Sequence, residues 1–265
     1  MNATALRPIG DLLREWRQRR RLSQLDFSVE AEISSKHLSF LETGRSRPSR
    51  EMLLKLAELL EVPLRERNTL LISAGFAPMF SERKLDDPSL QAAREAMEIV
   101  LKGHEPYPAI AVDRHWTLLA ANRAVAPMLT GVTAELLAPP MNVLRASLHP
   151  DGLAPRIVNL AEWRAHIFAR LRRQIEISAD PVLVALLEEL MALPAPEHPT
   201  GRNGNELTNA FVVPMRLATP MGVLSFISTT TVFGTPIDVT LSELALESFF
   251  PADAATAAAL RQMPL

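Results

Sequence analysis

Residues 23–44, SQLDFSVEAEISSKHLSFLETG, decide the fold of the first part of this chain. Apolar side chains recur in this stretch with the rhythm of two short helices that share a small core, namely Leu25, Phe27, Ala31, Ile33, Leu38 and Leu41. Ser34 stands where the second helix would begin, so its hydroxyl can accept backbone N–H bonds as an N-cap. The stretch therefore predicts a pair of helices with a tight corner between them.

The outward face of the second predicted helix follows from its inward face. Because Leu38 and Leu41 point into the core, the residues beside them must point away from it. These residues are Ser35, Lys36, Ser39 and Phe40. The geometry is that of a helix-turn-helix, in which the second helix lies in the DNA major groove. Lysine can donate to guanine, serine can donate or accept, and an aromatic ring can pack on a thymine methyl group.

Several spaced positions carry a family resemblance. They are Ser23-Gln24, Ser34, Leu38, Leu41–Gly44 and Arg45–Pro48. Over about residues 9–74 the chain resembles the phage repressor and Cro-like (XRE) helix-turn-helix proteins. The resemblance implies a five-helix DNA-binding domain in which Gln24 contacts the DNA backbone. Glu32 stands where the family usually has glycine, and a plain helical hairpin of an interaction domain is the alternative interpretation.

Basic residues around the motif are candidates for phosphate contacts. Arg17, near the end of a first helix, is either a phosphate contact or part of a solvated helix end. Arg45 and Arg47 follow Gly44 on the loop that would face the DNA backbone. For Phe40, packing within the protein is the alternative to a base contact. The full predicted DNA-binding set is Arg17, Gln24, Ser34, Ser35, Lys36, Ser39, Phe40, Arg45 and Arg47.

Charge is distributed unevenly along the chain. The 265 residues carry a net charge of −2, but residues 1–84 hold fifteen Lys/Arg against eleven Asp/Glu, which leaves the remainder acidic. A basic segment before an acidic one suits a DNA reader attached to a domain that does not touch DNA. There is no cysteine, which excludes disulfides and thiol chemistry. Without an apolar run of membrane-spanning length or a signal-peptide pattern, we expect a cytoplasmic protein with no membrane contact.

We predict three segments in the chain. Residues 1–78 form the all-α helix-turn-helix domain, residues 79–103 a connector with a linker helix, and residues 104–265 a second domain. The helices that complete the first domain are expected near residues 9–21, 49–60 and 63–74, with Leu70, Leu71 and Ile72 inward.

The second domain mixes strand and helix patterns. Strands are expected near residues 109–113, 116–121, 210–218, 223–232 and 244–250. Helices are expected near residues 160–177, 181–193 and 251–262. Two strands, then helices, then three strands predict an α+β domain, in which helices cover one face of a five-stranded antiparallel sheet.

Four segments of this domain carry a second resemblance: PAIAVDRHWTLLAANRA at 108–124, NVLRASLHPDGLAPRI at 142–157, NLAEWRAHIFARLRRQ at 159–174 and FFPADAATAAAL at 249–260. With the order of elements, they resemble a PAS-like sensor domain, and more narrowly the ligand-binding domain of MmyB-like transcription regulators. The resemblance covers about residues 85–265. It implies that a small, largely apolar molecule such as a fatty acid binds between sheet and helices.

A ligand pocket of this kind needs apolar walls and a few fixed polar groups. Candidate walls are Trp116, Leu144, Phe168, Leu171, Phe211, Met215 and Phe226, for which plain core packing is the alternative. Candidate polar groups are Asn122, Asn142, Arg145, His149 and Arg156. Arg145 or Arg156 could pair with a ligand carboxylate, or could equally brace loops.

No common catalytic motif is present in the sequence. The Gly-rich phosphate loop, H-E-x-x-H and G-x-S-x-G are absent, and the six histidines lack metal-ligand spacing. We therefore expect no enzyme, no metal site and no required cofactor. His166, on a predicted helix, is the best placed of the histidines for a haem, although an ordinary hydrogen-bonded histidine is the simpler interpretation.

Two hypotheses of function remain. The first is a homodimeric, ligand-responsive transcription regulator that reads a palindromic operator in double-stranded DNA. A dimer is expected because one small helix-turn-helix reads few bases, whereas a two-fold pair reads two half-sites. In the second hypothesis the C-terminal domain serves only dimerisation or protein docking, without a ligand.

Overall fold

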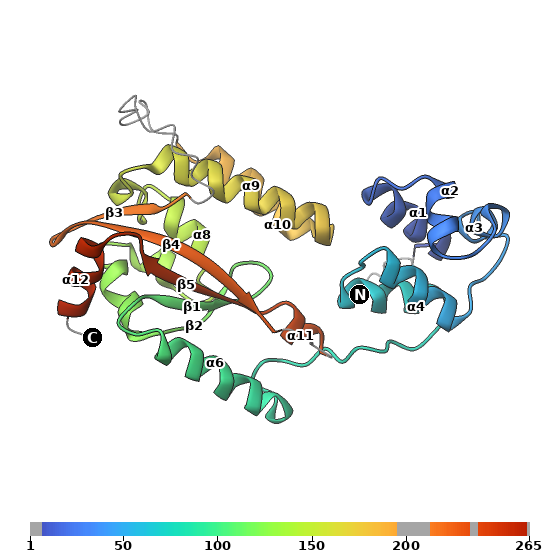
Figure 1. Cartoon of the computed structure of the whole chain (residues 1–265), viewed down its shortest axis with the longest axis horizontal. Coiled ribbons are helices and arrows are strands. Elements are labelled where there is room, and N and C mark those ends of the chain that lie inside the picture. The colour runs from blue at the N-terminus through green and yellow to red at the C-terminus, as the bar shows by residue number, and fades with distance from the viewer. Residues whose placement is uncertain (1–6, 195–212, 234–237, 264–265) are drawn as a thin grey trace. The chain divides into compact units, whose positions relative to one another are not determined.

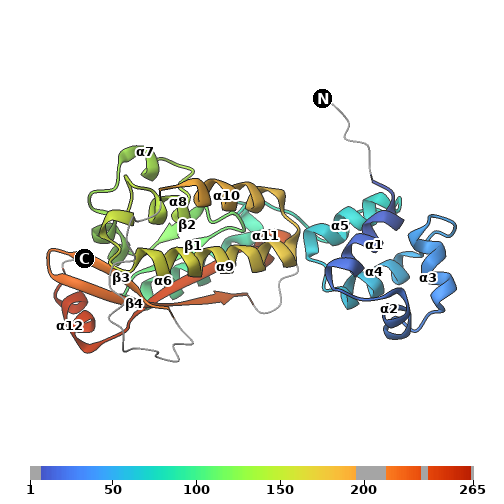
Figure 2. The same ribbon diagram turned by 90° about the horizontal axis from the view of Figure 1, so that it is seen from above.

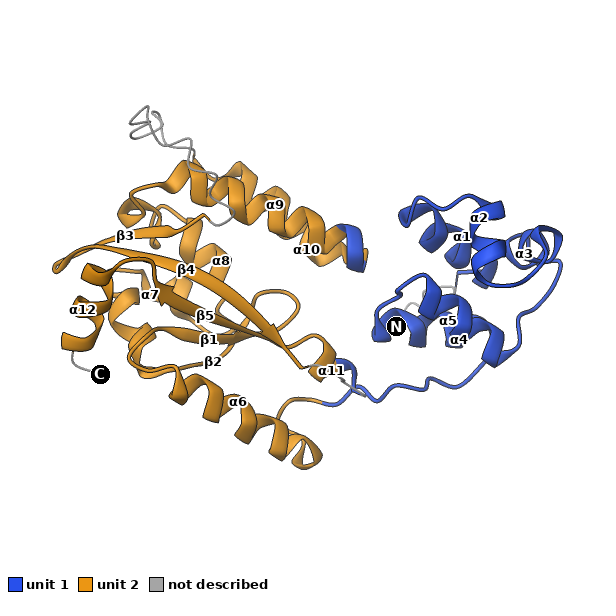
Figure 3. Cartoon of the chain, in the orientation of Figure 1, with its two compact units in different colours: residues 1–83, 176–178, 236–239 blue, residues 84–175, 179–235, 240–265 orange. Residues whose placement is uncertain are grey.

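The chain forms two compact units in a computed structural model, which describes residues 7–194, 213–233 and 238–263 (Figure 1). One unit is built mainly from the described residues up to Arg83, with short segments at 176–178 and 238–239 (Figure 3). The other described residues form the second unit. The two units correspond to an all-α domain followed by an α+β domain, as the sequence predicts.

Five helices make up the first unit: α1 (Ile9–Arg19), α2 (Gln24–Glu30), α3 (Ser35–Glu42), α4 (Arg50–Leu59) and α5 (Leu64–Ser73). Three of them begin after a serine whose hydroxyl accepts a backbone N–H, namely Ser23, Ser34 and Ser49. Ser23 also forms a capping box with Asp26. The cap predicted at Ser34 is confirmed.

The core of this unit consists of apolar side chains with almost no exposure, among them Leu13, Phe27, Leu38, Leu41, Leu53, Leu56, Leu70 and Leu71. Leu25 is 64% exposed and Ile72 is 41% exposed, so the prediction that they lie in the core is wrong. The reason is helical geometry. Each residue turns the helix by about 100°, which puts Leu25 roughly 200° away from Phe27. Ile72 likewise follows two residues that already fill the inward face.

The corner between α2 and α3 has the left-handed backbone that favours glycine. Glu32 has a φ of 57° at this corner. Its side chain is 80% exposed, and its carboxylate accepts a hydrogen bond from Lys55 Nζ at 2.7 Å. The chain thus makes the sharp corner with a glutamate and stores some backbone strain there.

Replacing Glu32 with glycine should leave the free energy of unfolding unchanged or raise it by up to about 1 kcal/mol. The left-handed conformation costs roughly 1–2 kcal/mol for a residue other than glycine. Relief of this strain offsets two losses, the larger unfolded-state entropy of glycine and the weak surface ion pair with Lys55. Glu58→Gly, at an exposed position of α4, is the matched control and should lose about 1 kcal/mol. Urea unfolding measures both variants. An equal loss in the two would contradict strain at Glu32.

A five-stranded antiparallel sheet forms the centre of the second unit (Figure 1). Its strands are β1 (Ala109–Val112), β2 (Leu118–Ala121), β3 (Met215–Thr219), β4 (Gly222–Val232) and β5 (Ala245–Pro251). Their spatial order is β2-β1-β5-β4-β3, so the last strand in sequence is the central one. The predicted sheet is confirmed. Residues 210–212 of the predicted third strand lie outside the described residues.

Helices cover both faces of this sheet. On one face, α6 (Gln91–Gly103) packs Met97 and Leu101 against Ala111 and Leu246. On the other lie α8 (Val143–Leu148), α9 (Leu160–Ser178) and α10 (Pro181–Ala192), with α9 and α10 side by side (Figures 1 and 2). The prediction of helices on one face only is therefore wrong. All four residues of β1 are buried, as in a strand whose two faces are both covered.

Shorter elements complete the described part of the chain: η1 (Pro88–Leu90), η2 (Arg123–Leu129), α7 (Ala134–Leu137), η3 (Ala154–Arg156), α11 (Val239–Ser242) and α12 (Ala254–Gln262). Among the described residues, none of the helices combines the length and hydropathy needed to cross a membrane.

Candidate DNA-binding helix and ligand pocket

Helix α3 presents a basic and aromatic surface away from the core. Leu38 and Leu41 are fully buried, whereas Lys36 is exposed and Ser39 and Phe40 are half-buried. This alternation follows from the helical spacing of the two leucines. It leaves on one side of α3 the side-chain types that read base edges.

The ring of Phe40 is flanked by two cations. Lys36 Nζ lies 5.6 Å from the ring centroid, and Arg45 Cζ lies 5.8 Å from it. Both distances fall within the range of cation–π attraction. The carbonyl of Phe40 also accepts the backbone N–H groups of Arg45 and Ser46, which fixes the loop after α3. Arg45 and Arg47 on this loop are exposed.

The first serines of α3 bond within the motif. Ser34 Oγ accepts the backbone N–H of His37 at 3.1 Å. Ser35 Oγ lies 2.9 Å from Ser28 Oγ of α2, so the two hydroxyls share a hydrogen bond. The first bond caps α3, and the second joins α3 to α2 within the helix-turn-helix.

A buried ion pair joins α1 to the end of α3. Arg17 Nε donates to Glu42 Oε1 at 2.6 Å, and Arg17 Nη2 donates to Glu42 Oε2 at 3.0 Å. The third nitrogen of Arg17 donates to the carbonyl of Leu22 at 2.7 Å, and Gln24 Nε2 donates to Glu42 Oε2 at 2.7 Å. Arg17 is only 7% exposed. This corrects the prediction that Arg17 contacts phosphate, and it shows that the Gln24 amide is engaged by Glu42.

Glu42 is the residue of this network that sequence reasoning missed. It follows the buried Leu41 directly and lies four residues after the buried Leu38, a spacing that places it on the inward side of α3. Burial alone would raise the pKa of Glu42. Hydrogen bonds from Arg17 and Gln24, together with nearby positive charge, outweigh burial and hold the pKa below its usual value.

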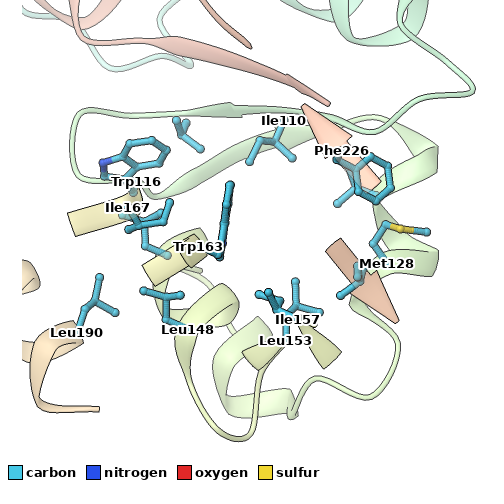
Figure 4. Close-up of a cluster of buried hydrophobic side chains, with 14 of the residues drawn as sticks. Ile110, Trp116, Met128, Leu148, Leu153, Ile157, Trp163, Ile167, Leu190 and Phe226 are labelled. Atoms are coloured by element: carbon cyan, nitrogen blue, oxygen red, sulfur yellow. The ribbon is translucent and has the colours of Figure 1, made fainter. Parts of the chain in front are cut away.

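An apolar pocket lies between the sheet and the helices on its α9 face. Its volume is about 110 Å³, which is several times the roughly 10–15 Å³ that a single water molecule needs. Figure 4 shows Ile110, Met128, Trp163 and Phe226 around an open space. The apolar residues that line the pocket are Pro108, Ile110, Trp116, Leu118, Val125, Met128, Leu129, Met141, Val143, Leu144, Ala146, Leu153, Trp163, Ile167, Met215, Phe226 and Phe249.

Four of the predicted wall residues therefore face the pocket: Trp116, Leu144, Met215 and Phe226. The other three do not line it in the described structure. Leu171 is fully buried in the surrounding core. Phe168 is half-buried under the guanidinium of Arg164, whose Cζ lies 5.3 Å from the ring centroid. Phe211 lies outside the described residues.

Trp116 occupies the turn between β1 and β2 rather than the predicted strand. It has a φ of 66°, which is uncommon for a bulky residue. Its indole N–H donates to Gln174 Oε1 at 3.0 Å, and Gln174 Nε2 donates to the carbonyl of Arg114 at 3.1 Å. These bonds from α9 hold the ring against the pocket. Strained backbone of this kind is found preferentially at binding sites.

The sequence analysis missed a small polar cluster at one side of the pocket, called here the polar pole. Its members Arg170 and Glu247 line the pocket, and Thr230 is hydrogen-bonded to both of them. Arg170 of α9 donates to both carboxylate oxygens of Glu247 on β5, and its Cζ lies 4.5 Å from the ring centroid of Trp116. Thr230 Oγ1 donates to Glu247 Oε1 at 2.8 Å. The signal was present: Glu247 is the one charged residue in the apolar run LALESFF, 244–250.

Two family models match the chain. The MmyB-like transcription regulator ligand binding domain matches residues 93–263, which is more than half of the chain. The chain belongs to the MmyB-like transcription regulators. A helix-turn-helix domain matches residues 8–70, so this regulator joins a DNA-binding domain to the ligand-binding domain, as the sequence predicts. A comparison with curated proteins gave no match.

The two asparagines predicted to hold a ligand in this MmyB-like regulator brace its backbone instead. Asn122 bonds three backbone groups between α6 and β1 at 2.8–3.1 Å. Asn142 caps α8 by accepting two backbone N–H bonds at 3.1 Å, and it donates to the carbonyl of His115 at 2.8 Å. Neither side chain lines the pocket, and both amides use their donors and acceptors on the surrounding backbone.

The three basic candidates also bond within the ligand-binding domain, which corrects their predicted role as ligand contacts. Arg145 forms a bidentate ion pair with Glu189 of α10 at 2.6 and 2.7 Å. Arg156 donates to three carbonyls of neighbouring loops and strands, which is the bracing alternative. His149 Nδ1 accepts the backbone N–H of Asp151 at 3.1 Å.

His166 stacks on Trp163 with ring centroids 5.3 Å apart. Burial lowers the pKa of His166, and the positive charge of Arg170 lowers it further, so the imidazole is held neutral near pH 7. His166 does not line the pocket. Within the described ranges, no group of three or more His, Asp or Glu side chains is placed to hold a metal ion.

Proposed function

We propose that this MmyB-like regulator binds a palindromic operator as a homodimer, and that a small apolar ligand in the pocket changes its affinity for that DNA. Ligand binding is inferred from the pocket, whose walls are almost entirely aliphatic and aromatic. Such walls suit a fatty-acid-like aliphatic chain, since burial of apolar surface drives its binding. The regulator is proposed to act in the cytoplasm, without catalysis and without a required cofactor.

The DNA half of the proposal rests on the outward surface of α3 and the loop that follows it. Exposed Lys36 and Arg45 flank Phe40, so a compact group of donors and one apolar ring face away from the core. A two-fold pair of such helices would read two half-sites about one helical turn apart. The residues proposed to contact DNA are Gln24, Ser34, Ser35, Lys36, Ser39, Phe40, Arg45 and Arg47.

Coupling between ligand and DNA requires the ligand to bind the DNA-competent and DNA-incompetent forms with different affinity. The test has two parts. Mass spectrometry of an organic extract of the purified protein should release an aliphatic molecule. Fluorescence anisotropy with operator DNA, isolated by selection from random sequences, should then show an operator affinity that changes as this molecule is added. An empty protein whose operator affinity never changes would contradict the proposal and favour a domain for dimerisation or docking.

Arg47→Ala should weaken binding to operator and random DNA by the same factor. Arg47 is exposed on the loop after α3, and a phosphate contact carries no sequence information. The slope of log affinity against log salt should fall by about 1. Arg173→Ala, at an exposed position of α9, is the control and should change neither quantity. An unchanged salt slope for Arg47→Ala would exclude the phosphate contact.

A further inference from the structure

The polar pole of the pocket carries no net charge. Arg170 Nη1 donates to Glu247 Oε2 at 2.9 Å, and Nη2 of the same side chain donates to Oε1. Thr230 Oγ1 accepts from Arg170 Nη2 and donates to Glu247 Oε1. The guanidinium and the carboxylate therefore neutralise each other, and both carboxylate oxygens are occupied.

Glu247 is committed to this arrangement by its position in the sheet. It lies on the central strand β5, in register between Ile110 of β1 and Thr230 of β4. It is 2% exposed, whereas the side chain of Arg170 is 26% exposed. A buried carboxylate that loses its cationic partner becomes an uncompensated charge, which is strongly unfavourable.

Arg170 keeps hydrogen-bonding capacity toward the pocket that it lines. A guanidinium has five N–H donors, and three hydrogen bonds account for its contacts with Glu247 and Thr230. The stacking on Trp116 uses the face of the guanidinium and not its edge. The N–H groups that remain, including Nε, can donate to an acceptor in the pocket. Ser228 supplies one further hydroxyl in the lining.

We infer that the pocket selects an apolar chain that ends in an uncharged hydrogen-bond acceptor, such as an ester, ketone or alcohol, over the free carboxylate of the same chain. The inference rests on the proposed ligand binding and refines its ligand class. A carboxylate at the polar pole would lie beside Glu247 and repel it. The ligand carboxylate could form an ion pair with Arg170 only if Arg170 left Glu247, and Glu247 would then be a buried charge without a cation. A neutral acceptor uses the spare donors and leaves the ion pair intact.

The test compares two ligands that share one chain, decanoate and methyl decanoate. Trp116 and Trp163 line the pocket, so tryptophan fluorescence of the full-length protein reports binding. At pH 8 the ester should bind about tenfold more tightly than the acid, or better, which is the scale of one like-charge contact at reduced dielectric. Equal or tighter binding of decanoate would overturn the inference and leave the proposed ligand binding intact. If neither ligand binds, the proposed ligand class itself fails.

Glu247→Gln changes the net charge of the polar pole from zero to positive. Decanoate should then gain about tenfold or more in affinity, because Arg170 is free to pair with it, while the ester changes less than about threefold. The matched control is Glu189→Gln, which unpairs the exposed Arg145 outside the pocket and should change neither affinity. An unchanged ligand preference in Glu247→Gln would overturn the inference.

A second variant keeps the test valid if Glu247→Gln folds poorly. Arg170→Gln with Glu247→Gln removes both charges and leaves no unpaired ion in the core. Its preference for the ester over the acid should shrink well below the wild-type ratio, because the repulsion from Glu247 is gone. A ratio equal to that of the wild type would show that the ion pair does not set the ligand class.

Discussion

Glu42→Ala should lower the free energy of unfolding of the helix-turn-helix domain by about 3–5 kcal/mol. The substitution leaves the guanidinium of Arg17, whose side chain is 9% exposed, without the carboxylate that accepts two of its hydrogen bonds. Gln24 loses its acceptor at the same time. Urea unfolding followed by Trp16 fluorescence, with Trp116 and Trp163 replaced by phenylalanine, reports this domain separately.

The double variant Arg17→Met with Glu42→Leu is the control for this prediction. Replacing a whole buried ion pair by apolar side chains is often neutral or stabilising, so the double variant should recover most of the loss. If the double variant is as unstable as Glu42→Ala, the loss comes from packing at the end of α3. The buried, unpaired charge would then not be its cause.

The same pair gives the domain a pH dependence with a definite sign. The pKa of Glu42 lies below its usual value of 4.5 in the folded domain. A lowered pKa contributes stability that is fully present above the unfolded value and is lost as the pH falls through the folded one. The stability difference between wild type and Glu42→Gln should therefore be constant above about pH 5 and shrink below that. A difference that grows on acidification would contradict the assignment.

Lys36→Ala should weaken operator binding by about 1–3 kcal/mol, which is the worth of a good base contact. Lys36 is exposed on α3, and its ammonium lies 5.6 Å from the Phe40 ring centroid, so the side chain is partly ordered before DNA arrives. The expected signature is loss of specificity. Binding to random DNA should fall much less than binding to the operator in an anisotropy titration at one salt concentration.

Lys102→Ala is the matched control for Lys36→Ala, because it removes an exposed lysine from α6 of the ligand-binding domain. It should leave both affinities unchanged. Equal losses on operator and random DNA in Lys36→Ala would make Lys36 a phosphate contact instead. A loss of stability in the same variant would point to packing between Lys36 and Phe40.

Local sequence patterns were sufficient for most of the secondary structure. The serine caps, the helical spacing of Leu38 and Leu41, and the two hairpins all involve residues close together in the chain. Such patterns are read correctly because caps, turns and helical periodicity depend on neighbours within a few positions. The prediction for Leu25 is wrong although it depends only on neighbouring residues, since an apolar residue on a short helix need not face the core.

The predictions for polar side chains were the least successful for a physical reason. A buried polar group must find a partner, and the sequence does not say which. Asn122 and Arg156 resemble ligand contacts in sequence, because both are polar residues among apolar neighbours. In the fold they satisfy backbone groups of their own domain. The same rule, applied to Glu247 in its apolar strand, would have required a buried cation nearby.

The sequence by itself determined the family, the two-domain order, the antiparallel sheet and the outward face of α3. These depend on motifs and on periodicities of two and about 3.6 residues. Only the tertiary structure decided the two buried ion pairs. Glu42 lies 25 residues from Arg17, and Glu247 lies 77 residues from Arg170. Partners so far apart meet only when the chain is packed, so the fold, and not local pattern, sets the charge of the core and of the pocket.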